Sequence, residues 1–176
     1  MHIGEEQSVN MSESELKEVY DSSLVFGHNL HQMPNGWLYL VAVIDWFSRY
    51  ILSWELSNTL DTACCVSALQ AALEMGKPEI FNTDQGSQFT SNLFTAELLN
   101  RDIRVSMDGR GRAFDNIFIE RFWRTVKYEE VYLKEYRTFI DAYSGLKGFI
   151  KFYNDERLHQ SLDYKFPYEV HHQFFT

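Results

Sequence analysis

The chain has 176 residues, of which 45% are hydrophobic and 16% aromatic, so its length and composition favour one folded domain of ordinary size. No apolar run approaches the 18 residues of a membrane-spanning helix, and the acidic N-terminus has no apolar segment typical of a secretory signal. The formal net charge of −9 argues against a protein that binds nucleic acid over its whole surface.

The first 33 residues differ in character from the rest. Residues 1–26 carry six acids and one base, a net charge of −5. Ser12 and Glu15 fit a capping box, which predicts a short helix over 16–20. We interpret 1–33 as a divergent N-terminal segment.

From residue 37 onward, regular elements follow one another. Apolar runs over 37–44 and 50–56, joined by a polar turn, predict a β-hairpin. Further along, the sequence predicts helix 62–75 capped by Asp61 or Thr59, strand 79–82, helix 91–100, strand 103–106, helix 116–130 and helix 138–153. Strands first and alternating elements afterwards predict an α/β fold, in which helices flank a mixed β-sheet.

Two carboxylates stand out in this pattern. Asp84 follows a short strand and precedes a glycine turn, and Glu120 lies near the start of helix 116–130. Hard divalent cations prefer carboxylate oxygens, and two such ions can activate a nucleophile and stabilise a leaving oxygen in phosphodiester chemistry. Each residue also has a plain alternative, because Asp favours turns and Glu120 can pair with Arg124 on a solvated helix face.

The helix that carries Glu120 has two distinct faces. Ile119, Phe122 and Val126 define a core face, while Asn116, Glu120, Arg124 and Lys127 share another. The stretch 101–127 holds seven bases and four acids, a local net charge of +3. The residues that we predict to contact DNA are Lys127, Arg124, Asn116, Arg110, Arg112 and Gln88.

These segments resemble the catalytic domain of the DDE transposase and integrase superfamily, in particular insertion-sequence transposases of the copy-and-paste kind. Besides Asp84 and Glu120, the resemblance is carried, in order, by the blocks 35–40, 43–49, 106–112 and 153–159. It implies an RNase H-like fold, with 34–170 as the catalytic core and 171–176 as a tail.

The resemblance also implies a function. It implies DNA transposition and integration by metal-dependent strand cleavage and transfer, with Asp84 and Glu120 as catalytic ligands of Mg²⁺ or Mn²⁺ in a two-metal site. Lys127 inherits contact with the DNA end. The implied partners are transposon ends, target DNA and further transposase subunits in an oligomer. The implied location is the bacterial cytoplasm, at the nucleoid and away from membranes.

One departure from the family changes this interpretation. The first catalytic Asp of the family, in a Trp-x-x-Asp-x-Thr-Tyr pattern, falls on Gly27 when counted back from Trp37 without a gap. Asp21 is the only nearby upstream carboxylate. Three hypotheses stay open: a transposase domain with impaired catalysis, an inactive remnant that keeps the fold and binds only DNA or a partner, and a structural or regulatory fragment that dimerises with an intact transposase and blocks it.

Other polar residues have structural interpretations. We expect Asp45 to cap its turn or pair with Arg49. Arg157 and His159 belong to a family block, and we expect them to tie the last helix to the body of the domain. We expect the adjacent Cys64 and Cys65 to be apolar and unbridged, and the histidines at 28, 31, 171 and 172 to lie at the surface.

Overall fold

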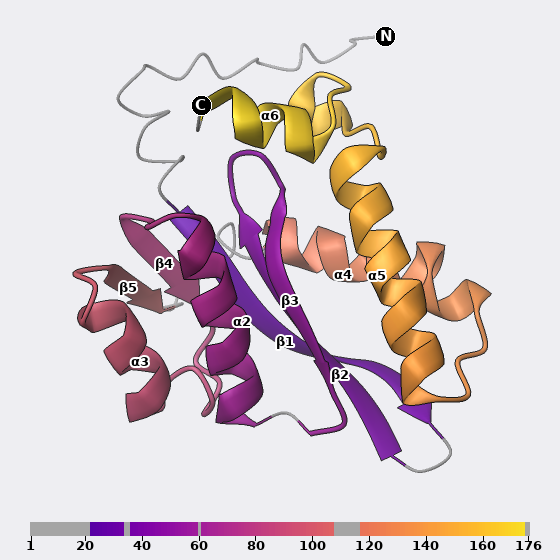
Figure 1. Ribbon diagram of the computed structural model, residues 1–176, viewed down its shortest axis with the longest axis horizontal. Coiled ribbons are helices and arrows are strands. Elements are labelled where there is room, and N and C mark those ends of the chain that lie inside the picture. Colours follow the sequence, from indigo (N-terminus) through magenta and orange to yellow (C-terminus); the bar gives the residue numbers. More distant parts are fainter. Residues whose placement is uncertain (1–21, 34–35, 60, 108–116, 175–176) are drawn as a thin grey trace, which may run out of the picture.

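A five-stranded mixed sheet lies at the centre of the molecule (Figure 1). The computed structural model describes residues 22–33, 36–59, 61–107 and 117–174. The strands are β1 (Ser22–Met33), β2 (Gly36–Asp45), β3 (Ile51–Ser57), β4 (Ile80–Thr83) and β5 (Arg104–Met107), in the spatial order β3-β2-β1-β4-β5. The first three pair antiparallel, and β4 and β5 add in parallel to β1. The predicted hairpin and mixed sheet are confirmed.

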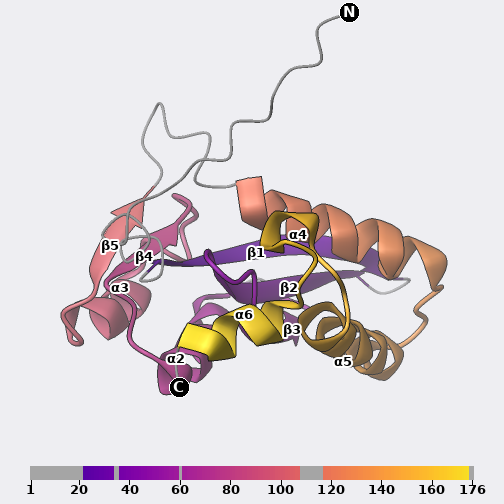
Figure 2. The same cartoon turned by 90° about the horizontal axis from the view of Figure 1, so that it is seen from above.

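Helices cover both faces of this sheet (Figures 1 and 2). The helices are α2 (Thr62–Met75), α3 (Asn92–Leu99), α4 (Ile117–Glu129), α5 (Phe139–Asp155) and α6 (Pro167–Phe174), with single 3-10 turns η1 (Val131–Leu133) and η2 (Gln160–Leu162). Figure 2 shows α4 running along β1 on one side of the sheet and α2 on the other. No helix in the described part of the chain is both long and apolar enough to cross a bilayer.

The alternation of side chains along β2 divides the interior into two cores. Leu38, Leu40, Ala42 and Ile44 join the core beneath α4 and α5. Val41 and Val43 join the core beneath α2 and α3. Successive side chains of a strand point to opposite faces, so a strand covered on both faces reads as a continuous apolar run.

The helix boundaries have local causes that the sequence already indicated. The Asp61 side chain caps α2 by accepting a hydrogen bond from the Cys64 backbone at 2.9 Å. Thr138 and Asp141 form a capping box at the start of α5. On α4 the predicted core residues Ile119, Phe122 and Val126 are buried. The capping box predicted at 12–15 lies outside the described residues.

Strand β1 shows that the sheet begins inside the segment interpreted as divergent. Residues 22–33 pair with both β2 and β4 and therefore occupy the middle of the sheet. An N-terminal truncation that preserves the sheet can therefore remove residues up to 21 and no further.

Two glycines of α5 provide a matched test of packing. A Cβ at Gly145 would collide with the hydroxyl of Tyr136, which is buried and hydrogen-bonded to the buried Glu130, whereas a Cβ at Gly148 would meet nothing within 4 Å. We expect Gly145→Ala to lower the free energy of unfolding by about 1–3 kcal/mol through overpacking, and Gly148→Ala to raise it by about 0.5–1 kcal/mol. Urea unfolding of both variants checks this, and equal shifts would contradict it.

Candidate catalytic and nucleic-acid site

Asp84 comes directly after β4, and its side chain is half-buried. Its Oδ1 accepts a hydrogen bond from the Gly86 backbone N–H at 2.7 Å, which is an Asx turn. A Cβ at residue 86 would lie 2.8 Å from the same oxygen, so glycine is what lets this turn close. The turn interpretation of Asp84 is confirmed, and the same hydrogen bond orients the carboxylate at the strand end.

Glu120 lies in the first turn of α4, with an exposed side chain. The helix is held against the sheet by its buried face and contacts β1. The start of α4 is the end of that helix nearest β4 (Figures 1 and 2). Because β1 also pairs with β4, the two carboxylates belong to elements that flank the same strand.

The parallel pairing of β1 with β4 identifies which position of β1 comes beside Asp84. Val25 is the register partner of Thr83. The next residues along the two strands are therefore Phe26 and Asp84. The gapless count from Trp37 instead selected Gly27.

The antiparallel pairing of β1 with β2 assigns these two positions to opposite faces. Position 26 stands opposite Ala42, which belongs to the core beneath α4, and position 27 stands opposite Val41, which belongs to the core beneath α2. Directly opposite residues of an antiparallel pair share a face, so position 26 lies on the side of Glu120. A bulge in β1 between Asn29 and His31 shifts the register relative to a simple count.

The described residues around Asp84 and Glu120 do not fit a two-metal centre. Neither phenylalanine nor glycine offers a ligand at the critical positions of β1. Among the described residues, no three His, Cys, Asp or Glu side chains gather into a group that could hold a metal ion. Two carboxylates supply too few anionic ligands for a pair of Mg²⁺ ions, each of which demands near-octahedral oxygen coordination.

The residues predicted to contact DNA differ in their exposure. Arg124 is exposed, and its guanidinium lies 5.9 Å from the centre of the Tyr128 ring. Lys127 and Gln88 are half-buried. Asn116, Arg110 and Arg112 lie outside the described residues.

The structure contains a basic cavity that the sequence did not predict. Its volume is about 230 Å³, and it lies where α4 meets the turn after β2 and the segment after α5. It is lined by Arg49, Arg121, Phe122, Arg124, Thr125, Tyr153, Arg157, His159 and Ser161. The sequence signal was the presence of Arg49, Arg157 and His159 in two family blocks, but about 110 residues separate those blocks along the chain.

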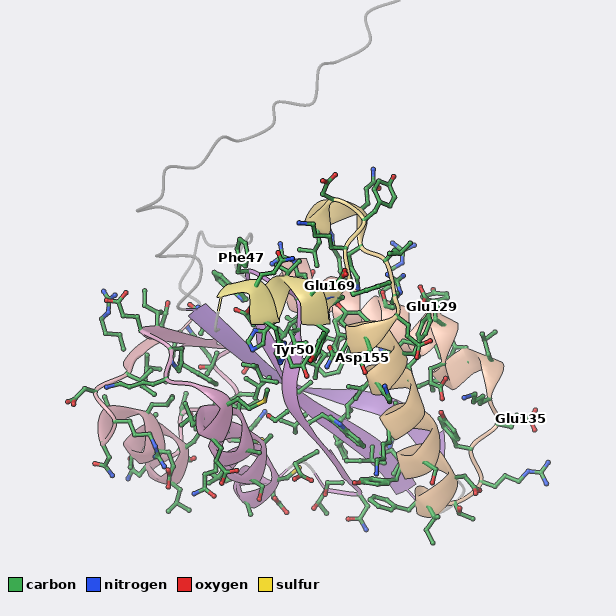
Figure 3. All side chains as sticks on the ribbon, turned by 45° about the horizontal axis from the view of Figure 1, so that its top comes forward. Phe47, Tyr50, Glu129, Glu135, Asp155 and Glu169 are labelled. Atoms are coloured by element: carbon green, nitrogen blue, oxygen red, sulfur yellow. The ribbon has the colours of Figure 1, made fainter. Side chains whose placement is uncertain are left out.

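Arg157 confirms its predicted structural role. Its Nε and Nη2 donate to the two carboxylate oxygens of Glu129, at the end of α4, at 3.0 and 2.6 Å (Glu129 is labelled in Figure 3). Such two-point Arg–carboxylate pairs combine geometric specificity with charge. This ion pair ties the segment after α5 to α4.

Asp45 is a buried cap of the turn after β2, as predicted. Its Oδ1 accepts a hydrogen bond from Phe47 N at 3.4 Å, and its Oδ2 accepts from Ser48 N at 3.1 Å and from the Ser48 hydroxyl. His171 Nδ1 lies 3.4 Å from the same Oδ2. Serine, histidine and aspartate meet here without forming a hydrolytic triad, because one ring nitrogen faces both partners and all three residues are buried.

The surface assignment of His171 is wrong. Helix α6 lies over the turn, and the imidazole stacks on the Tyr50 ring with centroids 4.7 Å apart. Figure 3 shows Tyr50 beneath α6. His172 is half-buried, while the side chains of the histidines at 28 and 31 lie outside the description.

The two cysteines have the expected apolar character. Both are free thiols, Cys65 buried and Cys64 half-buried. Burial is the main cause that raises the pKa of Cys64 to about 11 and that of Cys65 to about 12. Thiols held in this way carry almost no thiolate at neutral pH and are poor nucleophiles.

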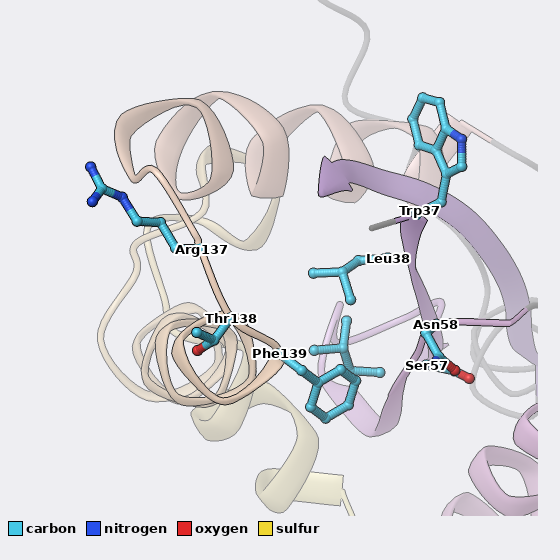
Figure 4. A pocket seen from close by; sticks show the side chains of 9 residues that line it. Trp37, Leu38, Ser57, Asn58, Arg137, Thr138 and Phe139 are labelled. Carbon is cyan, nitrogen blue, oxygen red and sulfur yellow. The ribbon is translucent and has the colours of Figure 1, made fainter. Parts of the chain in front are cut away.

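A larger hollow, of about 700 Å³, lies at the other end of the hairpin, between β2, β3 and the start of α5 (Figure 4). Leu38 and Phe139 project into it, and Arg137 is directed away. Among the described residues, its lining contains no carboxylate and no histidine.

Comparison with known proteins agrees with this architecture. Two family models, each described as an integrase core domain, match residues 28–113 and 101–167 and together span most of the chain. The transposase for insertion sequence element IS904 of Lactococcus lactis subsp. lactis (strain IL1403) is 34% identical over 136 residues, which cover 75% of this chain and 54% of that protein. The chain belongs to the integrase core domain family. It is a transposase- or integrase-type catalytic domain.

Other relatives agree with this assignment. Transposase InsF for insertion sequence IS3A of Escherichia coli (strain K12) is 37% identical over 97 residues, covering 53% of this chain and 34% of that protein. The chain thus spans about half the length of the first relative, and its match covers a third of the second.

Solved structures establish the fold. The catalytic core domain of HTLV-2 integrase, solved in complex with magnesium in a dimeric form, superposes with a TM-score of 0.67 at 19% identity, covering 87% of this chain and 97% of that one. A simian T-cell lymphotropic virus intasome in complex with PP2A regulatory subunit B56 gamma gives a TM-score of 0.72 at 19% identity, over 87% of this chain and 54% of that chain. The predicted RNase H-like fold is confirmed.

Proposed function

We propose that this domain derives from a metal-dependent transposase that cleaved and joined DNA strands, and that the chain has lost most of that activity. The observation that carries the proposal is the register of β1, which supplies no carboxylate beside Asp84 at position 26 or 27. Asp84 and Glu120 are the remaining pair, and we expect their carboxylates within about 10 Å of each other, close enough to share a metal site.

The proposed partner is DNA, both transposon ends and target. Arg124 and Lys127 lie on the α4 face that also carries Glu120, at i+4 and i+7, where a phosphate backbone approaching Glu120 would meet them. The proposed cation is Mg²⁺ or Mn²⁺. The proposed location is the bacterial nucleoid, in the cytoplasm. The proposed assembly is a homo-oligomer or a mixed oligomer with intact transposase subunits. An inactive fragment that joins such an oligomer and blocks it is the alternative, favoured by the same missing carboxylate.

Residual DNA binding is expected to be weak, tolerant of sequence and sensitive to salt. Reversing two charges in Arg124→Glu/Lys127→Glu is expected to reduce the affinity for DNA at least about 10-fold at low salt. It is also expected to make the slope of log K against log salt shallower, by an amount that corresponds to about two phosphate contacts. Gel-shift titrations over a salt series measure both quantities. Arg137→Glu/Lys147→Glu makes the same charge change at exposed residues away from this face and is expected to bind nearly as the unaltered chain does.

Removing the acidic residues 1–21 is expected to tighten DNA binding at low ionic strength, because it removes a net charge of −5. The deletion ends at 21 so that β1 stays whole. If the full chain, the deletion and the double variant bind equally, or none binds at low salt, the nucleic-acid role of the α4 face is wrong.

A further inference from the structure

The basic cavity described above, which we call the arginine pocket, gathers four arginines: Arg49, Arg121, Arg124 and Arg157. We infer that the arginine pocket binds a single phosphate group. The inference rests on the proposed function only for the source of that phosphate, a DNA strand.

The charge of the lining is strongly positive. Among the residues that the structure describes, no carboxylate lines the cavity. Glu129 pairs with Arg157 from outside it, at 2.6 Å, and Asp45 acts on Arg49. Across the part of the chain that the structure describes, Arg121 and Arg124 form no ion pair with a carboxylate. The pocket therefore has more positive charge than its protein neighbours neutralise.

Arg49 and Arg121 line the same cavity, and the charge of Arg121 acts on Arg49. Its pKa is lowered to about 10, chiefly because the side chain is buried, and the positive charge of Arg121 adds to the lowering. Tyr153 and Asp45 act in the opposite direction. An anion between these cations would offset both the burial and the repulsion.

His159 also lines the cavity. Its Nε2 is buried and has no hydrogen-bond partner among the residues that the structure describes. Its pKa is lowered to about 4, first by burial and then by the charges of Arg157 and Arg49, with Glu129 opposing. The ring is therefore neutral at physiological pH, and the tautomer with its proton on Nε2 can donate to an anion. Buried polar atoms without a partner are rare in folded proteins.

Size and shape point to a phosphate group. The cavity of about 230 Å³ is smaller than typical pockets for drug-sized ligands, which measure about 300–1,000 Å³. A phosphate group fits within it and presents several oxygens to several donors at once. Planar guanidinium groups match phosphate oxygens in two-point contacts, and the Ser161 hydroxyl adds another donor.

The position of the pocket connects it to a DNA strand. Arg124 lines the pocket and stands at i+4 from Glu120 on α4. A strand that passes Glu120 would reach the pocket within one helical turn, so one of its phosphates could seat there. Two of the blocks that carry the family resemblance, 43–49 and 153–159, also meet at this place.

Titration of the full chain with sodium phosphate, at constant ionic strength set by sodium chloride, tests the pocket directly. The imidazole resonances of His159 are followed by NMR over a pH series. Without phosphate, we expect His159 to protonate only near pH 4. With phosphate bound, we expect a saturable resonance shift and a pKa of His159 above about 5, because a nearby anion favours the protonated ring.

Variants of the lining separate specific binding from general attraction. Arg121→Gln/Arg124→Gln is expected to weaken phosphate affinity at least about 10-fold, because it removes two charge-assisted donors. Arg104→Gln, an exposed arginine outside the pocket, is expected to leave it unchanged. If His159 does not respond saturably, or if the double variant binds phosphate as tightly as the full chain, the inference is overturned.

Competition identifies the source of the phosphate. A single-stranded oligonucleotide is tested with and without a 5′-phosphate for its ability to displace inorganic phosphate. Displacement by both forms supports a backbone phosphate, and displacement by the phosphorylated form alone supports a terminal phosphate. If neither displaces it, the pocket still binds phosphate, the DNA source is wrong and only the proposed DNA role of α4 is weakened.

Discussion

Millimolar Mg²⁺ or Mn²⁺ is expected to leave the melting temperature of the unaltered chain nearly unchanged and to support negligible joining of DNA ends. The Phe26→Asp variant is expected to gain a saturable, metal-dependent stabilisation. Position 26 lies beside Asp84 and on the sheet face of α4, so an aspartate there adds a third carboxylate to the pair. With a dissociation constant on the order of 0.1 mM, 10 mM metal would add about 2.7 kcal/mol to the free energy of unfolding.

Three variants make this test specific. Phe26→Asp/Asp84→Asn removes a ligand again and is expected to abolish the metal effect. Gly27→Asp makes a similar change on the opposite face of the sheet and is expected to destabilise the domain without creating a metal response. Differential scanning fluorimetry over a metal series, with calcium as a comparison ion, provides the measurement.

Robust Mg²⁺-dependent joining by the unaltered chain, abolished by Asp84→Asn, would contradict the proposed loss of activity. That result would require a third carboxylate from elsewhere, and Asp21, directly before β1, is the one to test by Asp21→Asn. An equal metal response from Gly27→Asp and Phe26→Asp would instead contradict the assignment of position 26 to the face of α4.

Asp45→Ala is expected to lower the free energy of unfolding by about 3–5 kcal/mol, a large part of the total for a domain of this size. The carboxylate is buried and accepts hydrogen bonds from two backbone N–H groups and the Ser48 hydroxyl, with His171 against the same oxygen. Its removal leaves buried donors without partners and loosens the contact between α6 and the turn.

Asp61→Ala is the matched control for this variant. Asp61 also accepts a backbone hydrogen bond, but it caps the exposed start of α2, where water replaces the lost bond. Its expected cost is about 1 kcal/mol. Chemical denaturation of the two variants measures the difference, and equal costs would show that the buried Asp45 cluster contributes no more than an ordinary helix cap.

The sequence by itself determined most of the local structure. The apolar periods of 37–44 and 50–56 predicted the hairpin, and Asp61 and Ser91 mark helix starts that the structure retains. The core face of α4 followed from helical spacing alone. These features depend on residues within one or two turns of each other, so local propensity and patterning suffice to specify them.

The tertiary structure decided the features that depend on register and on distant segments. The composition of 22–33 gave no family pattern, yet pairing with β2 and β4 makes it the central strand. A bulge of one residue changes which position of β1 faces α4, because side chains alternate with a period of two. No count along the sequence contains that information.

The sequence also did not predict which polar side chains are buried and which charged side chains lie close together. The sequence predicted that His171 lies at the surface, but the packing of α6 places it against Asp45, 126 positions away. The arginine pocket unites segments near residues 49, 121 and 157 that no motif places together. The sequence determines which groups are available, and only the packing of the fold determines which of them line one cavity, where their charges and hydrogen bonds act on one another.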